Sequence, residues 1–221
     1  MSKLKLGVIF GGMSTENEVS VASATSILNN LDREKYEIYP IYIGKDGIWY
    51  EYEEMGEKRE FGQSVKQDKK IPDVMQYLKG LDVLFPVLHG LYGEDGTIQG
   101  LFELLKVPYV GCKVLASSVG MDKVYTKIIF ERAKLEQAKY VYVRKYKDEY
   151  IYYIDKNFNE KIVNLDEIVD IAQEKLKYPM FVKPSNSGSS VGIKKAKNKD
   201  ELKQNIEFAA QFDNKILIEE G

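Results

Sequence analysis

Cysteine, histidine and long apolar runs are nearly absent from this sequence of 221 residues. The single cysteine, Cys112, cannot form a disulfide within the chain, and the single histidine is His89. The apolar runs, such as Val83–Leu88, fall far short of the ~20 residues that span a bilayer. These absences exclude a disulfide-stapled scaffold and a chain that crosses a membrane, and they indicate a cytoplasmic protein.

Neither sign of charge dominates the sequence. The 32 Lys and Arg residues nearly balance the 34 Asp and Glu residues, which leaves a net charge of −2. A chain so close to neutral has no overall bias toward nucleic acid or membrane surfaces. Hydrophobic residues make up 44% and charged residues 30%, which is typical of a globular protein. The length of 221 residues allows one large domain or two small ones.

The first part of the chain alternates strands with helices. Leu4–Phe10 is apolar and ends at Gly11-Gly12, after which Ser14–Glu18 resembles a capping box at a helix start. Tyr36–Ile43 predicts a second strand, and the resulting βαβ unit predicts a parallel sheet. Further elements are expected at Ile48–Tyr52, Asp82–Val87, Thr97–Lys106, Val107–Gly111 and Val114–Ala133, with a polar surface excursion at Glu53–Asp73.

The pattern changes after about Lys134 and predicts an α+β part. Strands are expected at Tyr140–Val143, Tyr150–Ile154, Tyr178–Lys183, Val191–Lys195 and Lys215–Glu219, and helices at Asp166–Lys175 and Lys199–Gln211. The last of these strands begins just before Gly221, which predicts an unpaired sheet edge at this point. We therefore expect the sequence to be an N-terminal portion of a larger protein.

Three loop segments carry residues suited to binding a ligand. Gly11–Glu16 follows a strand and opens a helix, so its N–H groups can approach a ligand; a plain tight turn gives the same pattern. Leu88–Gly96 follows a buried strand and contains His89, but a solvent loop with an incidental histidine is an equal alternative. In Lys183–Gly192, a lysine is followed by a Ser/Gly loop whose hydroxyl and N–H groups suit phosphates. A flexible hairpin loop without a ligand is the alternative.

Together these segments resemble the D-alanine–D-alanine ligases of the ATP-grasp superfamily. The motifs fall in the family's order, and the resemblance covers nearly the whole chain. They are Gly11-Gly12-x-Ser14-x-Glu16-x-Glu18-Val19-Ser20, Leu88-His89-Gly90-x-x-Gly93-Glu94-Asp95-Gly96-Thr97-x-Gln99-Gly100, Ser117-Ser118 with Met121-Asp122-Lys123, and Val182-Lys183-Pro184 with Gly188-Ser189-Ser190-Val191-Gly192. Asn17 departs from the family, which often has a basic residue there.

The resemblance implies an α/β fold in three parts. A Rossmann-like N-terminal parallel sheet (pre-ATP-grasp) would be followed by an α+β ATP-grasp small subdomain, truncated at the start of the large ATP-grasp subdomain. The corresponding ranges are 1–125 for the substrate-binding domain, 126–213 for the central subdomain and 214–221 for the start of the C-terminal subdomain. Family members commonly form homodimers through the N-terminal domain, which implies a second copy as partner. Neither nucleic acid nor a membrane is implied.

The family joins two D-alanines with ATP, for peptidoglycan synthesis. The carboxylate of the first D-alanine is phosphorylated, and the amine of the second attacks the acyl phosphate. By resemblance, Glu16 pairs with the ammonium of the first D-alanine, and His89 hydrogen-bonds its carboxylate. Ser189 lies over the transferring phosphate, with its hydroxyl linked to Glu16, and the backbone around Ser190 lies in the same loop.

The resemblance assigns the remaining residues to ATP. Lys123 and Lys183 would contact the phosphates. Glu219 would bind the adenine amino group, and Glu220 lies next to it. The family's Mg²⁺ ligands and a catalytic arginine belong to its C-terminal domain, so no metal ligand is expected in this chain.

Without a metal ion and that arginine, the charge of the triphosphate is not neutralised, and we expect the chain alone to have no ligase activity. A ligase that makes D-Ala-D-Ser or D-Ala-D-lactate remains open, and so does a non-catalytic binding remnant of the same fold. A dinucleotide-binding protein is a weaker alternative, because the glycine pattern is not GxGxxG.

Overall fold

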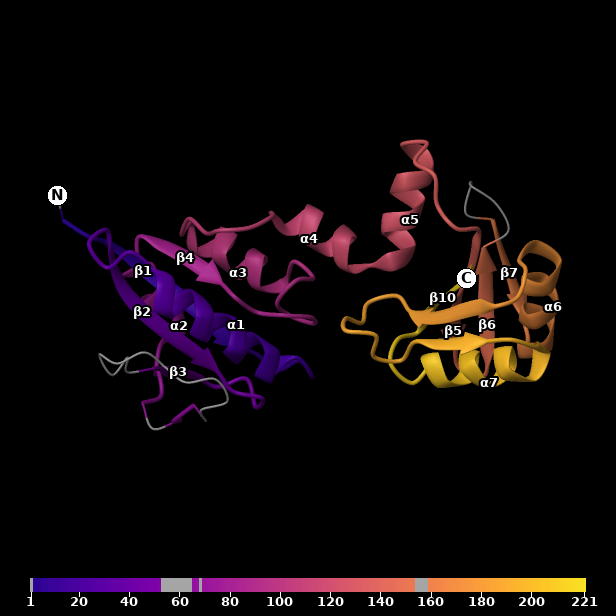
Figure 1. Ribbon diagram of the computed structural model, residues 1–221, viewed down its shortest axis with the longest axis horizontal. Helices are drawn as coiled ribbons and strands as arrows, with labels where there is room; N and C mark the ends of the chain where they lie inside the picture. The colour runs from indigo at the N-terminus through magenta and orange to yellow at the C-terminus, as the bar shows by residue number, and fades with distance from the viewer. Residues whose placement is uncertain (1, 53–64, 68, 154–158) are drawn as a thin grey trace. The chain divides into compact units, whose positions relative to one another are not determined.

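Strand β1 (Leu4–Gly11) forms where the sequence is apolar at nearly every position (Figure 1). The computed structural model describes residues 2–52, 65–67, 69–153 and 159–221. The chain divides into unit 1, Met1–Ser118, and unit 2, Val119–Gly221. Unit 1 contains a sheet with parallel strands and unit 2 an antiparallel sheet. The predicted α/β fold class, with an α+β second part, is therefore confirmed.

The sheet of unit 1 has the strand order β3-β2-β1-β4. Its other strands are β2 (Tyr36–Ile43), β3 (Trp49–Glu51) and β4 (Val83–Pro86). Strands β2 and β4 run parallel to β1, as the βαβ pattern predicts, whereas β3 is antiparallel to β2. The carboxyl ends of β1, β2 and β4 therefore meet at one edge, which is where loops of α/β sheets commonly bind ligands.

Helices cover both faces of this sheet, because successive side chains of a strand point to opposite faces. Val8 of β1 belongs to a buried cluster with Leu28 of helix α1 (Asn17–Asn30). Ile9, the next residue, packs on the other face with side chains from two further helices. The remaining helices of this part of the chain are α2 (Val74–Lys79), α3 (Thr97–Leu105) and α4 (Val114–Met121).

The start of α1 differs from the predicted capping box. Its N-cap residue is Glu16, whose side chain makes no capping hydrogen bond. The Ser14 hydroxyl accepts a hydrogen bond from the Glu16 backbone N–H (3.1 Å) and donates to the carbonyl of His89 (2.7 Å). Because Ser14 binds a long-range partner, its side chain joins two loops instead of capping the helix.

Two other predictions for this part of the chain need correction. The strand expected at Val107–Gly111 is reduced to an isolated bridge between Leu84 and Tyr109. The helix expected at Val114–Ala133 is broken at Asp122, which caps a separate helix α5 (Lys123–Arg132). The surface excursion expected at Glu53–Asp73 lies largely outside the described residues.

Unit 2 is built on an antiparallel sheet with the order β7-β6-β5-β10-β8-β9. Its strands are β5 (Tyr140–Tyr146), β6 (Glu149–Tyr153), β7 (Glu160–Val163), β8 (Met180–Pro184), β9 (Lys194–Ala196) and β10 (Lys215–Glu220). The predicted hairpin is confirmed, because β8 pairs with β9. Ile154, the expected end of β6, lies outside the described residues.

The expectation of an unpaired edge at Lys215–Glu219 is wrong. Strand β10 pairs with β5 on one side and with β8 on the other. Ile216 and Ile218 have no exposed surface. The continuous apolar run from Ile216 to Ile218 is typical of a central strand, and neighbours far away in the sequence supply its partners.

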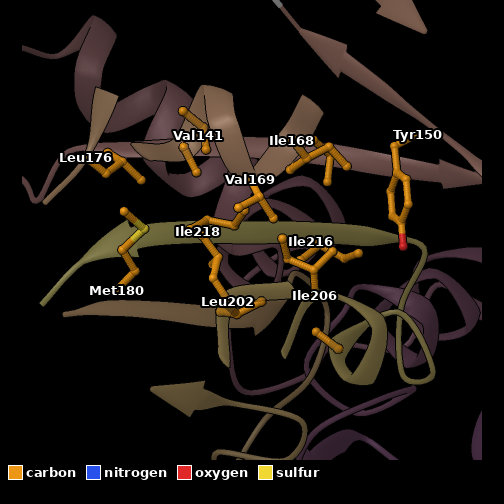
Figure 2. Packing of buried hydrophobic residues seen from close by; sticks show 14 of the residues in the cluster. Val141, Tyr150, Ile168, Val169, Leu176, Met180, Leu202, Ile206, Ile216 and Ile218 are labelled. Carbon is orange, nitrogen blue, oxygen red and sulfur yellow. The ribbon is translucent and has the colours of Figure 1, made fainter. Parts of the chain in front are cut away.

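Helices α6 (Leu165–Lys175) and α7 (Lys199–Ala209) complete the core of unit 2. Figure 2 shows side chains of both helices, including Val169 and Leu202, gathered around the central strand β10. Their burial fixes the sheet whose strands β8 and β10 carry Lys183 and Glu219. None of the helices within the described ranges is long and apolar enough to cross a membrane.

Candidate active site

The first glycine-rich loop of unit 1 follows β1 at the carboxyl edge of the sheet. Gly11 and Gly12 have φ angles of +89° and +99°, a region that L side chains rarely adopt. A Cβ at Gly11 would lie 2.3 Å from the carbonyl oxygen of Ile43. The backbone N–H of Gly11 donates to the Ser20 hydroxyl (2.8 Å), which itself donates to the carbonyl of Val87 (2.6 Å). The turn is therefore held closely against its neighbouring strand and helix.

Glu16 and His89, both expected at the substrate site, are brought to this same edge. The hydrogen bond from Ser14 to the His89 carbonyl joins the two loops. The carboxylate of Glu16 lies against Gly90, since a Cβ built on Gly90 would be 2.2 Å from Oε2. The edge thus presents an acidic group against the loop that carries the imidazole, and two such groups suit an amino acid with its ammonium and carboxylate groups.

The loop that carries His89 is ordered by its own side chains. The Glu94 carboxylate accepts a hydrogen bond from the Gly90 N–H (2.7 Å). The buried amide of Gln99 donates to the Gly93 carbonyl (2.8 Å). Of the two alternatives left by the sequence, these bonds argue against an incidental solvent loop.

A cavity of about 210 Å³ opens beside His89. Its lining is mostly apolar and includes Met13, Trp49, Leu88 and Leu101. A cavity of this kind has room for a small apolar group and offers little to a charged one.

In unit 2, Lys123 stands at the start of α5. The Asp122 side chain caps this helix by accepting hydrogen bonds from the N–H groups of Val124 and Tyr125 (3.0 Å each). The Lys123 ammonium donates to the carbonyl of Ser187, in the Ser/Gly loop. Burial lowers the pKa of Lys123, and the nearby charge of Lys183 lowers it further. The two predicted phosphate-binding lysines therefore lie close together.

Glu219 on β10 is the centre of an ionic cluster. It accepts hydrogen bonds from Lys183 on β8 and forms a 3.0 Å ion pair with Lys127 on α5. Burial raises the pKa of the Glu219 carboxyl, but the bonds from Lys183 and Lys127 outweigh this and hold the pKa below its usual value. The structure thus brings together Lys123, Lys183 and Glu219.

Ser189 and Ser190 lie on the exposed part of the Ser/Gly loop. Both have positive φ angles, +45° and +61°. The loop is closed below them by a hydrogen bond from the Ser187 hydroxyl to the Val191 carbonyl (2.8 Å). A turn of this shape can point successive N–H groups at an anion. The expected link from Ser189 to Glu16 joins the two units and stays a prediction.

The structure does not bring Glu220 into the cluster around Glu219. Adjacent side chains on a strand point to opposite faces. The Glu220 carboxylate accepts a hydrogen bond from the backbone N–H of Lys177 (2.9 Å). The hydrogen bond with Lys177 thus accounts for the position of the Glu220 side chain.

Sequence reasoning missed Lys127, Lys215 and Ser23. Lys127 follows Lys123 by four residues on α5, so helical spacing was a usable signal. Lys215 pairs with the buried carboxylate of Asp122, 93 residues away, and no local pattern reveals that contact. Ser23 lies 3.0 Å from the ring of His89, which was visible only in three dimensions.

A metal site is not supported by the described part of the chain. It contains no group of three or more His, Cys, Asp or Glu side chains arranged to hold an ion. Carboxylate oxygens are the ligands that Mg²⁺ prefers. Glu219, the carboxylate that contacts Lys183, already pairs with two lysines. The residues present therefore do not fit a resident magnesium ion.

Two family models match the chain in sequence order. The model described as D-ala D-ala ligase N-terminus matches residues 5–112, and that described as D-ala D-ala ligase C-terminus matches residues 129–221. The first match lies within unit 1 and the second within unit 2.

Curated relatives and solved structures agree with these matches. The D-alanine--D-alanine ligase of Clostridium novyi (strain NT) is 49% identical over 220 residues, which cover 98% of this chain and 60% of the relative. That of Clostridium acetobutylicum is 49% identical over 222 residues, which cover 99% and 61%. The chain thus spans about 60% of the length of these relatives.

Among solved structures, the VanG D-Ala:D-Ser ligase from Enterococcus faecalis has a TM-score of 0.79 and 34% identity, covering 100% of this chain and 63% of that one. The D-alanine-D-alanine ligase from Coxiella burnetii has a TM-score of 0.77 and 26% identity, covering 100% and 62%.

Proposed function

The chain belongs to the D-alanine–D-alanine ligase family, and we propose that it binds the first D-alanine and ATP for the ATP-dependent joining of two D-alanines. One observation carries this proposal: the N-terminal and C-terminal models of a single ligase family match the two units in order. The product would serve peptidoglycan synthesis.

Unit 1 would hold the first D-alanine. The Glu16 carboxylate would pair with its ammonium, and His89 would donate a hydrogen bond to its carboxylate. The proximity of Glu16 to Gly90, in the loop that carries His89, supports this assignment. Holding both ends of a small amino acid fixes the carboxylate that is to be phosphorylated, which is how positioning lowers the barrier.

Unit 2 would hold ATP, which supplies the phosphoryl group that activates the carboxylate. Lys123 and Lys183 would pair with the phosphates, and Glu219 would accept a hydrogen bond from the adenine amino group. In the described structure Lys183 is paired with Glu219, so binding would require Lys183 to exchange this partner for phosphate. The Ser189–Ser190 turn would cover the transferring phosphate with its N–H groups.

The second D-alanine would attack the acyl phosphate with its amine, and inorganic phosphate would leave. D-serine is the alternative second substrate, and the likeness to the VanG D-Ala:D-Ser ligase favours including it in any assay. No step in this scheme is assigned to magnesium, because the described residues do not fit it.

Two further parts of the proposal concern the setting of the protein. We place it in the cytoplasm, in keeping with its single cysteine and the need for ATP.

We propose a homodimer through unit 1, where Leu104 and Leu115 are 83% and 77% exposed. Replacing both leucines with serine should convert the dimer to a monomer in light scattering coupled to size exclusion.

A hybrid ligase tests the function directly. In it, this chain replaces the matched part of the Clostridium novyi enzyme, with which it shares 49% identity. We expect the hybrid to release phosphate when given ATP and D-alanine, and a panel with D-serine and D-lactate as second substrates identifies the product. A folded hybrid that releases no phosphate with any of these would refute the proposal.

A further inference from the structure

The ring of His89 contacts a side chain that lies outside the four motifs quoted above. The Ser23 hydroxyl oxygen lies 3.0 Å from His89 Nε2. Ser23 lies within α1, about two turns after its N-cap residue Glu16. Both Ser23 and His89 are half-buried, which limits competition from water.

The contact decides which nitrogen of His89 can act on a substrate. A neutral imidazole has one N–H donor and one acceptor nitrogen. A carboxylate only accepts hydrogen bonds, so the ring nitrogen that faces it must carry the proton. Because Ser23 occupies Nε2, the ring nitrogen left to face a carboxylate is Nδ1.

We propose that Ser23 is a positioning residue for His89. Its hydroxyl donates to Nε2, which holds the ring in the Nδ1–H tautomer and turns Nδ1–H toward the carboxylate of the first D-alanine. The tautomer is a property of the chain alone, whereas the orientation toward D-alanine rests on the proposed function. Ser23 therefore acts on the substrate only through His89.

The chain offers an unusually clean test, because it contains a single histidine. We would label histidine with ¹⁵N and record two-bond ¹H–¹⁵N correlations at alkaline pH, where the ring is neutral. The wild-type chain should show a protonated Nδ1 and an unprotonated Nε2. Ser23→Ala should shift the ring toward the Nε2–H form, and Ser23→Thr, which keeps the hydroxyl, should restore the wild-type pattern.

Ser26→Ala is the matched control, since Ser26 is an exposed serine on the same helix. It should leave the spectrum unchanged. A protonated Nε2 in the wild-type chain, or a tautomer unaffected by Ser23→Ala, overturns the proposal.

Titration with D-alanine separates this inference from the proposed function. Ser23→Ala should weaken D-alanine binding roughly fivefold, the effect of one hydrogen bond, while Ser26→Ala should not. If the Nδ1–H tautomer is present and depends on Ser23, but the hybrid ligase binds no D-alanine, the proposed function fails and the Ser23–His89 assignment stands. Equal D-alanine affinity in the wild-type and Ser23→Ala proteins overturns the role toward substrate.

Discussion

The carboxylate of Glu16 lies directly against the α-carbon of Gly90. A side-chain carbon at position 90 would sit 2.2 Å from Glu16 Oε2, far inside contact distance. Gly90 also has a φ of +71°, which disfavours any L side chain. Position 90 therefore requires glycine for two reasons: its backbone angle, and the lack of space for a side chain beside the Glu16 carboxylate.

Gly90→Ala should displace Glu16 and weaken the binding of D-alanine. Losing a charge-assisted hydrogen bond costs about 1.5–3 kcal/mol, so the KM for D-alanine in the hybrid ligase should rise at least ~10-fold. Gly100→Ala is the matched control, because a Cβ there meets nothing within 4 Å and the residue lies inside α3. It should leave KM unchanged and add about 0.5–1 kcal/mol of stability.

Asp122→Asn should destabilise unit 2. The carboxylate is 4% exposed and pairs with Lys215 and Ser185, while asparagine keeps the helix cap and loses the charge. We expect a loss of about 2–3 kcal/mol in the free energy of unfolding at neutral pH, measured by urea denaturation.

The loss should depend on pH in a defined direction. Burial raises the pKa of Asp122, but hydrogen bonds from Lys215 and Ser185 outweigh it, so the folded pKa lies below the ordinary 3.8. The stabilisation is therefore complete above pH 3.8 and disappears as the pH falls through the folded pKa. A difference between wild type and Asp122→Asn that stays constant down to acid pH would contradict this account.

The ion pair of Lys127 and Glu219 should contribute measurably to stability. Both side chains are only 13% exposed. A double-mutant cycle with Lys127→Met and Glu219→Gln should give a coupling of about 1 kcal/mol. The pair of Lys199 and Asp170, 51% and 60% exposed, is the control and should give about 0.5 kcal/mol or less. Equal couplings for the two pairs would show that burial does not strengthen the first one.

The 221-residue chain by itself should release no phosphate from ATP in the presence of D-alanine. By resemblance, the family's Mg²⁺ ligands and catalytic arginine belong to its C-terminal domain, so in this chain the charge that develops on the phosphates would be met without them. A phosphate-release assay at equal protein concentration, with the hybrid ligase as positive control, checks this. Phosphate release by the chain alone would contradict this prediction, because it would show that the chain contains every residue that the reaction needs.

The sequence predicted well whatever depends on local pattern. Tyr36–Ile43, for example, is a strand with the predicted bounds. Glu16 and His89 follow neighbouring parallel strands, so their meeting at one sheet edge could be foreseen from topology.

The misses share a physical cause, which is contact between residues distant in sequence. The apolar segment of β10 gave no sign of its two partners, so its position at the end of the sequence suggested an edge where the structure has a centre. Ser14 is a suitable cap residue by type, yet its hydroxyl binds the His89 carbonyl 75 residues away. Only the folded structure shows which of two partners such a group prefers.

We propose a division of labour in which unit 1 binds the first D-alanine and unit 2 binds ATP. Steady-state kinetics of two variants of the hybrid ligase test it most directly. Glu16→Gln should raise the KM for D-alanine and leave the KM for ATP unchanged, whereas Lys183→Met should do the reverse. If both variants raise the same KM, or if neither raises any, the division of labour is wrong.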